Sequence, residues 1–474
     1  MPVLISSAIL AFVLGVLFTI FIGPRILQAI LRRQIVSQLK GASPTIPFHL
    51  HTPASFREML SEGVPWLASL LDQDTAGRAL GTLQAKHPMT SSRPLGLADH
   101  EAIVWQIENS ILAKVLADAH VDYAALLRSC EQTGALDKEI KPVSHYGSRP
   151  SAGFRLPGEH EPLAGVLLSW PINYPSRWER HAELADQVRV AGAKPVILVP
   201  SAAWQALVDA YLKARAPAAQ PKILQIATDD VWIRDFGPHF VKTPEGGHAI
   251  IATPYVPIAQ NYQKYDNNAQ IELARAFNLP FYRFPLIVEG GNLVTDGAGT
   301  LVMTDAVLHY NPELTPSDLS AAFKGWFGID RLLLFPALKG ELTGHIDMIV
   351  KFADPSRVLV ADVPKGHPWK DDLNYIAQKL GETRAHAGTG ALYAVHRIMM
   401  APTQAHSPRV WSYINSLTVN DSIIMPLFDE ASDAAAIGVY RKLGFSHVVG
   451  IDYRDFPLGS VHCQTKEIPE GVAL

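Results

Sequence analysis

The sequence predicts an α/β domain over residues 155–474, preceded by a transmembrane helix within residues 1–24 and a mostly helical region over residues 41–137. Three observations support this organisation. An uncharged apolar run opens the chain, apolar residues then recur at helical spacing, and short β-branched runs finally alternate with helical segments.

The bulk composition is that of a folded protein with a large core. Of 474 residues, 48% are hydrophobic and 18% are charged, which excludes global disorder and leaves room for more than one domain. The net charge is −4, with basic and acidic residues interspersed, so nothing predicts a general attraction to nucleic acid. The only cysteines, Cys130 and Cys463, cannot build a disulfide framework, and this favours a reducing compartment.

Residues 3–22, VLISSAILAFVLGVLFTIFI, carry no charge and have about the length that a helix needs to cross a bilayer. A cleavable signal peptide is the alternative, but no basic residue precedes the run and no small-x-small cleavage site follows it. Because the early basic residues all follow the run, the positive-inside rule predicts a single-pass membrane protein whose main body is cytoplasmic. These basic residues are Arg25, Arg32, Arg33 and Lys40.

The region between the membrane segment and the α/β domain shows no recognisable chemistry. Stretches such as FREMLSEGVPWLASLLDQ have apolar residues at helical spacing, and Cys130, at the end of that pattern, is interpreted as structural. Residues 138–154 lie in a stretch rich in Pro, Gly, Ser and charge, which predicts a linker.

Beyond the linker, β-branched runs end in Pro or a polar residue, and helical segments such as AQIELARAF and ASDAAAIGVYRKLG separate several of them. This recurrence predicts several similar strand–helix units. Functional sites in such architectures gather at strand ends. The runs are KPVILVPS, AIIATPY, TLVMTD, RVLVADV, RIMMAPT and SIIMPLF.

Ionisable residues follow two of the predicted strands. Asp235 ends a Trp-x-Arg-Asp stretch that begins at Trp232, just before a Phe-Gly-Pro turn. Glu289 precedes two glycines, which allow a close approach of the backbone. Further on, Asp296 and Gly297 predict a hairpin turn.

A third stretch, TGHIDMIVKF, predicts a strand with one polar and one apolar face. Because strand side chains alternate, His345 and Asp347 are expected on one face and four apolar side chains on the other. Those four are Ile346, Met348, Val350 and Phe352.

Each feature also has an ordinary structural interpretation. Asp235 can belong to an ion pair or turn, Glu-Gly-Gly can be only a loop, and His345 can be a hydrogen-bonded residue at a strand start. Cys463 can be a small buried hydrophobe. Together, however, a thiol, an imidazole and several carboxylates are complementary to a guanidinium ion, which offers forked N–H donors to carboxylates and lowers the pKa of a nearby thiol.

Five segments, taken in order, resemble the agmatine deiminase and Porphyromonas-type peptidylarginine deiminase family. The resemblance implies a pentein-type five-unit α/β propeller, built from ββαβ units around a central site, with no cofactor. It also implies a small guanidine or an arginine-containing peptide as the substrate. The segments, spread over roughly residues 155–470, are LPGEHEPLAGVLLSWP, DDVWIRDFGP, VEGGNLVTDG, GHIDMIVKF and SYINSLTVNDSIIMPLFDEASD…LGSVHC.

The resemblance further implies a reaction and the residues that perform it. A thiolate attacks the guanidinium carbon, ammonia departs, and a covalent thiouronium intermediate is hydrolysed to a ureido group. The matching positions are Cys463 for the nucleophile, His345 for the general acid/base, Asp235 and Asp347 for the carboxylates that bind the guanidinium, and Glu289 and Trp232 for further substrate contacts.

The substrate stays open at this point, as does the oligomeric state. Agmatine deiminases usually have a run of glycines before their His-Cys pair, which Leu458 and Ser460 interrupt here, whereas GGNLVTDG is closer to the peptidylarginine branch. Three other functions remain: a metal site that uses the same His, Asp and Cys side chains, an amidinotransferase of the same fold, and a catalytically silent membrane-tethered guanidine-binding protein.

Overall fold

The computed structural model describes residues 54, 76–77, 149–150, 153–172, 177–255, 265–385, 391–402, 411–454 and 459–474. The predicted membrane segment, nearly all of the predicted helical region with Cys130, and most of the predicted linker lie outside these residues. Among the residues that are described, no helix combines the length and apolar character needed to span a membrane. The chain divides into two compact units, and the second, Cys130–Pro171 with Glu179–Leu474, contains the sheets.

Five small sheets in this unit repeat one ββαβ pattern. In each sheet a short inner strand pairs antiparallel with a central strand, one or two helices follow, and the next strand pairs parallel with the central one. The predicted α/β fold of five similar units is thereby confirmed. Four of the sheets are β4 (His239–Lys242), β5 (His248–Ala252) and β6 (Phe281–Arg283); β7 (Val294–Thr295), β8 (Thr300–Thr304) and β9 (Arg331–Phe335); β10 (Val350–Phe352), β11 (Arg357–Asp362) and β12 (Ala394–Met399); and β13 (Leu417–Val419), β14 (Ser422–Leu427) and β15 (His447–Asp452).

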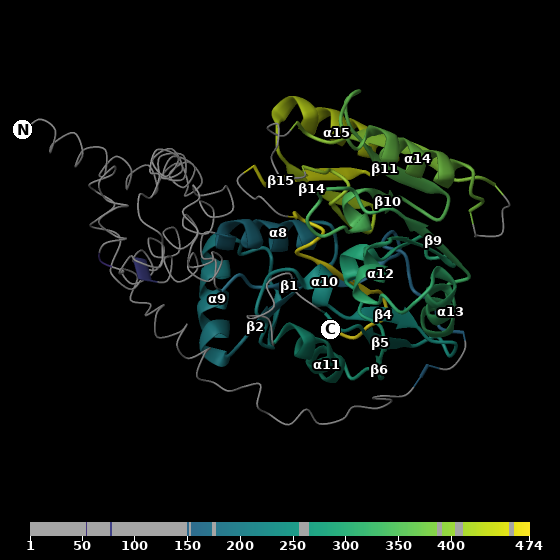
Figure 1. Ribbon diagram of the computed structural model, residues 1–474. Coiled ribbons are helices and arrows are strands. Elements are labelled where there is room, and N and C mark those ends of the chain that lie inside the picture. The colour runs from purple at the N-terminus through teal and green to yellow at the C-terminus, as the bar shows by residue number, and fades with distance from the viewer. Residues whose placement is uncertain are drawn as a thin grey trace, which may run out of the picture. The chain divides into compact units, whose positions relative to one another are not determined.

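The remaining sheet joins the two ends of the α/β domain. Its inner strand is the last of the chain, β16 (Lys466–Pro469), and its central strand is the first, β1 (Leu163–Ser169). The strands β2 (Lys194–Val199) and β3 (Lys222–Gln225) complete it. In Figure 1 the yellow C-terminal segment therefore runs among the teal strands of this sheet. The ring of sheets closes by pairing its first and last strands.

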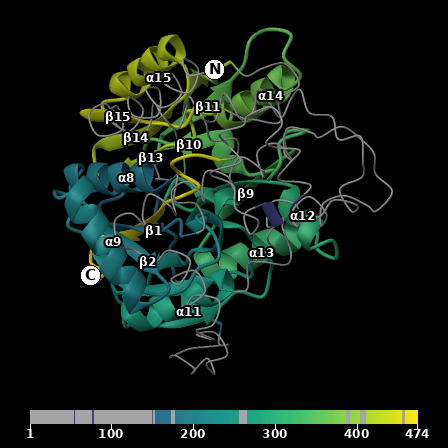
Figure 2. The same ribbon diagram turned by 90° about the vertical axis from the view of Figure 1, so that its left-hand side faces the viewer.

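The helices lie outside the sheets in both views (Figures 1 and 2). Side chains fix where several of them begin: Ser201 and Asp429 each accept a backbone N–H at a helix start, and Thr315 forms a capping box with Asp318. The helices are α8 (Trp178–Val190), α9 (Ala202–Arg215), α11 (Asp266–Ala276), α12 (Ala306–Tyr310), α13 (Pro316–Phe327), α14 (Lys370–Gly381) and α15 (Glu430–Lys442).

Burial explains why several central strands could be recognised in the sequence. Every residue of β8 and five of the six in β14 are buried, so these strands appear in the sequence as continuous apolar runs. All six predicted runs overlap strands, namely β2, β5, β8, β11, β12 and β14. The two predicted helical segments fall in α11 and α15.

The hairpin predicted at Asp296 and Gly297 is confirmed. It joins β7 to β8, and Gly297 has a φ of 67°, a conformation that glycine adopts without a steric penalty. Asp296 Oδ1 accepts the backbone N–H groups of Ala298 and Thr300, both at 2.8 Å. The aspartate side chain thus fastens the turn.

The strand predicted over TGHIDMIVKF is wrong in its first half. Ile346–Met348 form a 3-10 turn, η4, and only Val350–Phe352 form strand β10. Gly344, with a φ of 68°, turns the chain just before, and Ile349 N donates to Ile346 O at 2.8 Å, which closes the turn. In the first half of this stretch, the alternation of polar and apolar residues therefore belongs to a tight turn and not to a strand. The four apolar side chains are still buried.

Candidate active site

Five turns carry the candidate residues, one before each inner strand. Since the inner strands occupy equivalent places in the five units, residues far apart in the sequence meet at one end of the ring. The turns are α10 (Ile233–Phe236) before β4, η3 (Gly290–Asn292) before β7, η4 before β10, residues 413–415 before β13, and residues 461–464 before β16.

Cys463 lies in the last of these turns, and its side chain is buried, with 6% of the residue exposed. The side-chain amide of Asn415 donates to its Sγ atom at 3.1 Å, and Sγ lies 3.8 Å from Asp347 Oδ2. The Cys463 carbonyl accepts the backbone N–H of Arg234 at 3.2 Å, which ties this turn to α10. The thiol is therefore fixed by groups from three other segments.

The environment of Cys463 favours the neutral thiol. Burial raises the pKa of the thiol well above its ordinary value, and the charges of Asp347 and Asp235 raise it further. Hydrogen bonds from the Ser460 backbone and Asn415 act in the opposite direction. A cation bound between the carboxylates would remove much of this penalty and release the thiolate.

His345 lies between two carboxylates. Its Nε2 atom is 2.7 Å from Glu289 Oε2, and its Nδ1 atom is 3.4 Å from Asp235 Oδ1. Burial alone would lower the pKa of His345, but the two carboxylates outweigh it and raise this pKa to about 10. The ring is therefore an imidazolium at neutral pH and can donate a proton.

Asp235 has an unusual protonation equilibrium for an aspartate. Burial, with the nearby charges of Glu289 and Asp347, raises its pKa to about 7, although His345 and a hydrogen bond from Gly291 lower it. The Gly291 N–H donates to Asp235 Oδ1 at 3.0 Å. At neutral pH this carboxyl group is close to its midpoint and is sensitive to an arriving cation.

The two glycines after Glu289 are required by close contacts, as predicted. A Cβ atom on Gly290 would collide with the Arg234 carbonyl, and one on Gly291 would lie 2.5 Å from His345 Nδ1 and 2.7 Å from Asp235 Oδ1. Side chains at these positions would push apart the groups that form the site.

The Asp347 carboxylate, which lies near the thiol, has one oxygen without a hydrogen-bond partner among the described residues. Its Oδ2 atom accepts from His462 Nδ1 at 2.7 Å and from Asn415 Nδ2 at 3.2 Å. Its Oδ1 atom is buried and has no hydrogen-bond partner within the described part of the chain. Leaving a buried acceptor unsatisfied costs about 1–3 kcal/mol. The site is thus prepared to accept an N–H donor at this oxygen.

The structure brings the candidate residues together. Cys463, His345, Asp235, Asp347 and Glu289 form one cluster through the contacts above. The Trp232 ring borders the nucleophile, because a Cβ atom on Gly459 would lie 2.8 Å from Trp232 Cζ3 and 3.0 Å from Cys463 Sγ. Their catalytic and binding roles stay predictions.

Sequence reasoning missed Asn415 and did not explain Ser460. The Ser460 hydroxyl donates to the Asn415 carbonyl at 2.9 Å and lies 2.8 Å from Asn415 Oδ1. Asn415 stands two residues before an inner strand, where the other turns carry site residues. Asn415 could have been predicted from this equivalent position, which is visible only once the five units are aligned.

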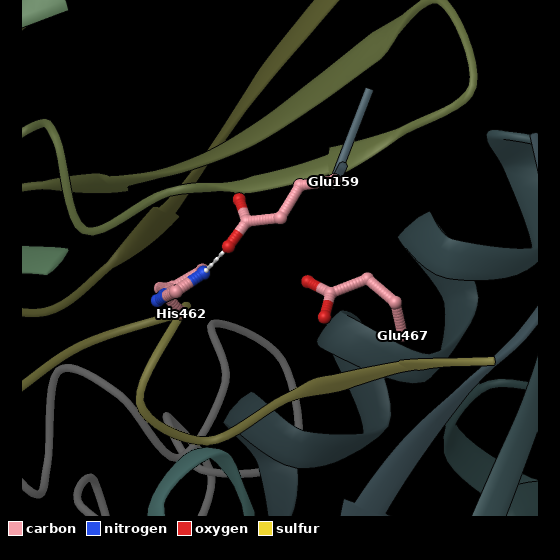
Figure 3. A group of neighbouring side chains, drawn as sticks. All are labelled: Glu159, His462 and Glu467. Carbon is pink, nitrogen blue, oxygen red and sulfur yellow. Dashed lines mark hydrogen bonds and ion pairs between the residues drawn. The ribbon is translucent and has the colours of Figure 1, made fainter. Parts of the chain in front are cut away.

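The residues that the sequence suggested for a metal site lie near one another, but they are not a group whose ligand atoms all lie within 4.8 Å in the described part of the chain. Among the described residues, the three whose ligand atoms all lie within 4.8 Å of one another are Glu159, His462 and Glu467 (Figure 3). Arg234 pairs with Glu467 through two contacts of 2.8 and 2.5 Å, and Lys351 lies 2.6 Å from Glu159. Since protein cations already neutralise both carboxylates, this cluster is an ion network.

The comparisons with known proteins agree with this geometry and confirm the resemblance drawn from the five segments. The family model for Porphyromonas-type peptidyl-arginine deiminases matches residues 155–469. An agmatine deiminase of Stutzerimonas stutzeri is 27% identical over 67% of this chain and 96% of its own length. One of Pseudomonas aeruginosa is 27% identical over 69% and 99%. The solved agmatine deiminase of Enterococcus faecalis shares the fold, with a TM-score of 0.60 and 20% identity over 67% of this chain and 96% of that one.

Proposed function

Because the chain belongs to the Porphyromonas-type peptidyl-arginine deiminase family, we propose that it hydrolyses a guanidinium group to a ureido group and ammonia through a covalent intermediate on Cys463. The observation that carries the proposal is the buried Oδ1 atom of Asp347, which has no hydrogen-bond partner among the described residues and belongs to the carboxylate whose Oδ2 lies 3.8 Å from the thiol. A guanidinium ion supplies such donors in a planar fork that suits carboxylates.

Binding prepares the nucleophile. The carboxylates of Asp347 and Asp235 accept N–H groups of the cation, and its positive charge offsets the negative charges that hold the thiol neutral. Cys463 then loses its proton to solvent, where the departing ammonia later takes up a proton to become ammonium, and the thiolate adds to the guanidinium carbon to give a tetrahedral adduct. Substrate binding and activation of the nucleophile are therefore coupled.

His345 serves first as an acid and then as a base. The imidazolium protonates one nitrogen of the adduct, which leaves as ammonia and leaves a thiouronium on Cys463. The neutral ring then takes a proton from water as the hydroxide adds to the same carbon. Collapse forms the C=O bond of the ureido product and breaks the C–S bond, and the hydroxyl proton returns to the thiolate.

Two substrate types fit this chemistry, namely a small guanidine such as agmatine and an arginine side chain in a peptide. The relatives described above are agmatine deiminases, whereas the matching family model is defined by peptidyl-arginine. In both substrates the guanidinium ends a flexible chain, so the same reacting group reaches Cys463.

The test is incubation of the full-length chain with agmatine, free arginine and an arginine-containing peptide, each with an ammonia assay. N-Carbamoylputrescine as product identifies a polyamine-related enzyme, and peptidyl-citrulline identifies an enzyme that modifies proteins. Ammonia release without an added amine distinguishes the deiminase from an amidinotransferase. No ammonia from any of the three, together with no labelling of Cys463 by a haloacetamidine, would refute the proposal and favour a guanidine-binding protein.

We also propose that the chain is a single-pass membrane protein with its catalytic domain in the cytoplasm. The uncharged run over residues 3–22 and the four basic residues that follow it support this topology. Protease added to intact cells should leave the catalytic domain undigested, and digestion from outside would reverse the assignment.

A further inference from the structure

His462, the neighbour of the nucleophile, is held between two carboxylates. Its Nδ1 atom lies 2.7 Å from Asp347 Oδ2, and its Nε2 atom lies 2.5 Å from Glu159 Oε1, with 2% of the residue exposed. Both contacts are hydrogen bonds only when both ring nitrogens carry hydrogens. The ring thus links Asp347 to Glu159.

The outer carboxylate is itself fixed by cations. Lys351 Nζ lies 2.6 Å from Glu159 Oε2, and Arg234 Nη1 lies 3.7 Å from Glu159 Oε1. Figure 3 shows the Glu159 carboxylate directed at the His462 ring, with Glu467 alongside. Although burial alone would raise the pKa of Glu159, the charges of His462, Lys351 and Arg234 hold it well below the ordinary value. Glu159 is therefore a permanent anion and a rigid support for the ring.

The consequence for the site concerns the orientation of Asp347. His462 and Asn415 both bind Oδ2, so the carboxylate cannot rotate without losing two hydrogen bonds, and Oδ1 remains the oxygen without a hydrogen-bond partner among the described residues. A carboxylate that rotated would turn a satisfied oxygen toward the substrate. The free acceptor on which guanidinium binding depends is thus a product of the contacts behind it.

We infer that His462 is a positioning residue for the deimination, which fixes Asp347 from behind and is itself fixed by Glu159. The inference rests on the proposed function and extends it, since neither His462 nor Glu159 touches the reacting atoms. Its role is to hold Oδ2 of Asp347, so that Oδ1 stays available to the cation.

Two substitutions separate the two faces of the imidazole. His462→Asn keeps a donor near the position of Nδ1 and loses the contact with Glu159, whereas His462→Gln keeps a donor near Nε2 and loses the contact with Asp347. Glu159→Gln removes the charge of the outer support and keeps its shape. If positioning acts through Asp347, His462→Gln must be the more damaging of the two histidine substitutions.

The readout is the ratio of two labelling rates of Cys463 in the full-length chain, one with a cationic haloacetamidine and one with neutral iodoacetamide. Both rates are measured on the same folded preparation, so protein that does not react affects them equally. We expect the ratio to fall about tenfold or more in His462→Gln, because a charge-assisted hydrogen bond is lost, and about threefold or less in His462→Asn. KM for the guanidine should rise in parallel.

His239→Asn is the matched control. This buried histidine lies at the start of β4, contacts Thr253 and Lys466, and makes no contact with Asp347. The ratio of the two labelling rates in His239→Asn should match that of the wild type. A wild-type enzyme without preference for the cation would refute the proposed function itself. A wild-type preference that His462→Gln retains, or that His239→Asn loses equally, would overturn this inference alone.

Discussion

Asn415 donates its side-chain amide to the Sγ atom of Cys463 across 3.1 Å. The carbonyl end of the same amide accepts the backbone N–H groups of Ser460 at 3.0 Å and of Cys463 at 3.4 Å, so its orientation is fixed. Since a hydrogen-bond donor stabilises a thiolate more than a thiol, Asn415 lowers the pKa of the nucleophile.

Asn415→Ala should therefore lower kcat/KM by about 10- to 100-fold through loss of a hydrogen bond to a charged group. The pKa of Cys463, measured from the pH dependence of iodoacetamide labelling, should rise. Asn311→Ala is the control, because that buried amide binds Ile287 and Val307 in another part of the domain. An unchanged thiol pKa in Asn415→Ala would remove this residue from the mechanism.

Substitutions of the predicted nucleophile and of the predicted general acid should have different effects. Cys463→Ser should abolish turnover, because a hydroxyl is a far weaker nucleophile at neutral pH. His345→Ala should also block turnover, yet mass spectrometry should detect a covalent adduct if thiolate attack still occurs. Cys130→Ser should leave activity near the wild-type level, and equal loss from both cysteine substitutions would contradict the choice of Cys463.

The pH dependence should follow Asp235 and His345. Below a pKa of about 7, Asp235 becomes neutral in the free enzyme and attracts the cation less, so kcat/KM should rise with pH up to about 7. Above a pKa of about 10, His345 loses its proton and kcat should fall. The haloacetamidine-to-iodoacetamide labelling ratio isolates the first limb, and a ratio that stays constant between pH 5 and 8 would count against Asp235 as a cation-binding group.

Stability should depend on the ion pair between Arg234 and Glu467. Arg234 is 2% exposed and Glu467 holds it through two contacts, so Glu467→Gln leaves a buried guanidinium without its main counter-charge. We expect a loss of about 3–5 kcal/mol in the unfolding free energy of the domain. Lys213→Met, at an exposed pair with Asp209, should leave the midpoint of thermal unfolding unchanged. Equal effects of the two substitutions would contradict a special role for the buried pair.

The central strands β5, β8, β11 and β14 were predictable because both of their faces are largely buried, and continuous β-branched runs follow from that. The inner strands were not, because β7 has two residues and β13 has three, too few for a periodic signal. The pattern at His345 and Asp347 was interpreted with the wrong period, since polar and apolar residues that alternate in the sequence are here all buried in a 3-10 turn.

The charged and nucleophilic site residues could be proposed from the sequence because few other kinds of site need a thiol, an imidazole and several carboxylates together. Asn415 and Glu159 could not, because an Asn before a strand and a Glu in a Pro-Gly-rich segment are ordinary there. Their importance comes only from contacts with residues far along the chain, namely Cys463 and His462. Non-local contacts of this kind leave no local pattern.

The pairing of β1 with β16 has a consequence for the order of assembly. Leu163 lies opposite Pro469, and contacts between such distant parts of a chain form slowly. The other four sheets pair strands that are close in sequence, so they can form first. During refolding, the circular dichroism signal should recover before activity does, because the thiol enters its place only when the C-terminal strand docks. Newly made chains would then be inert until that last step.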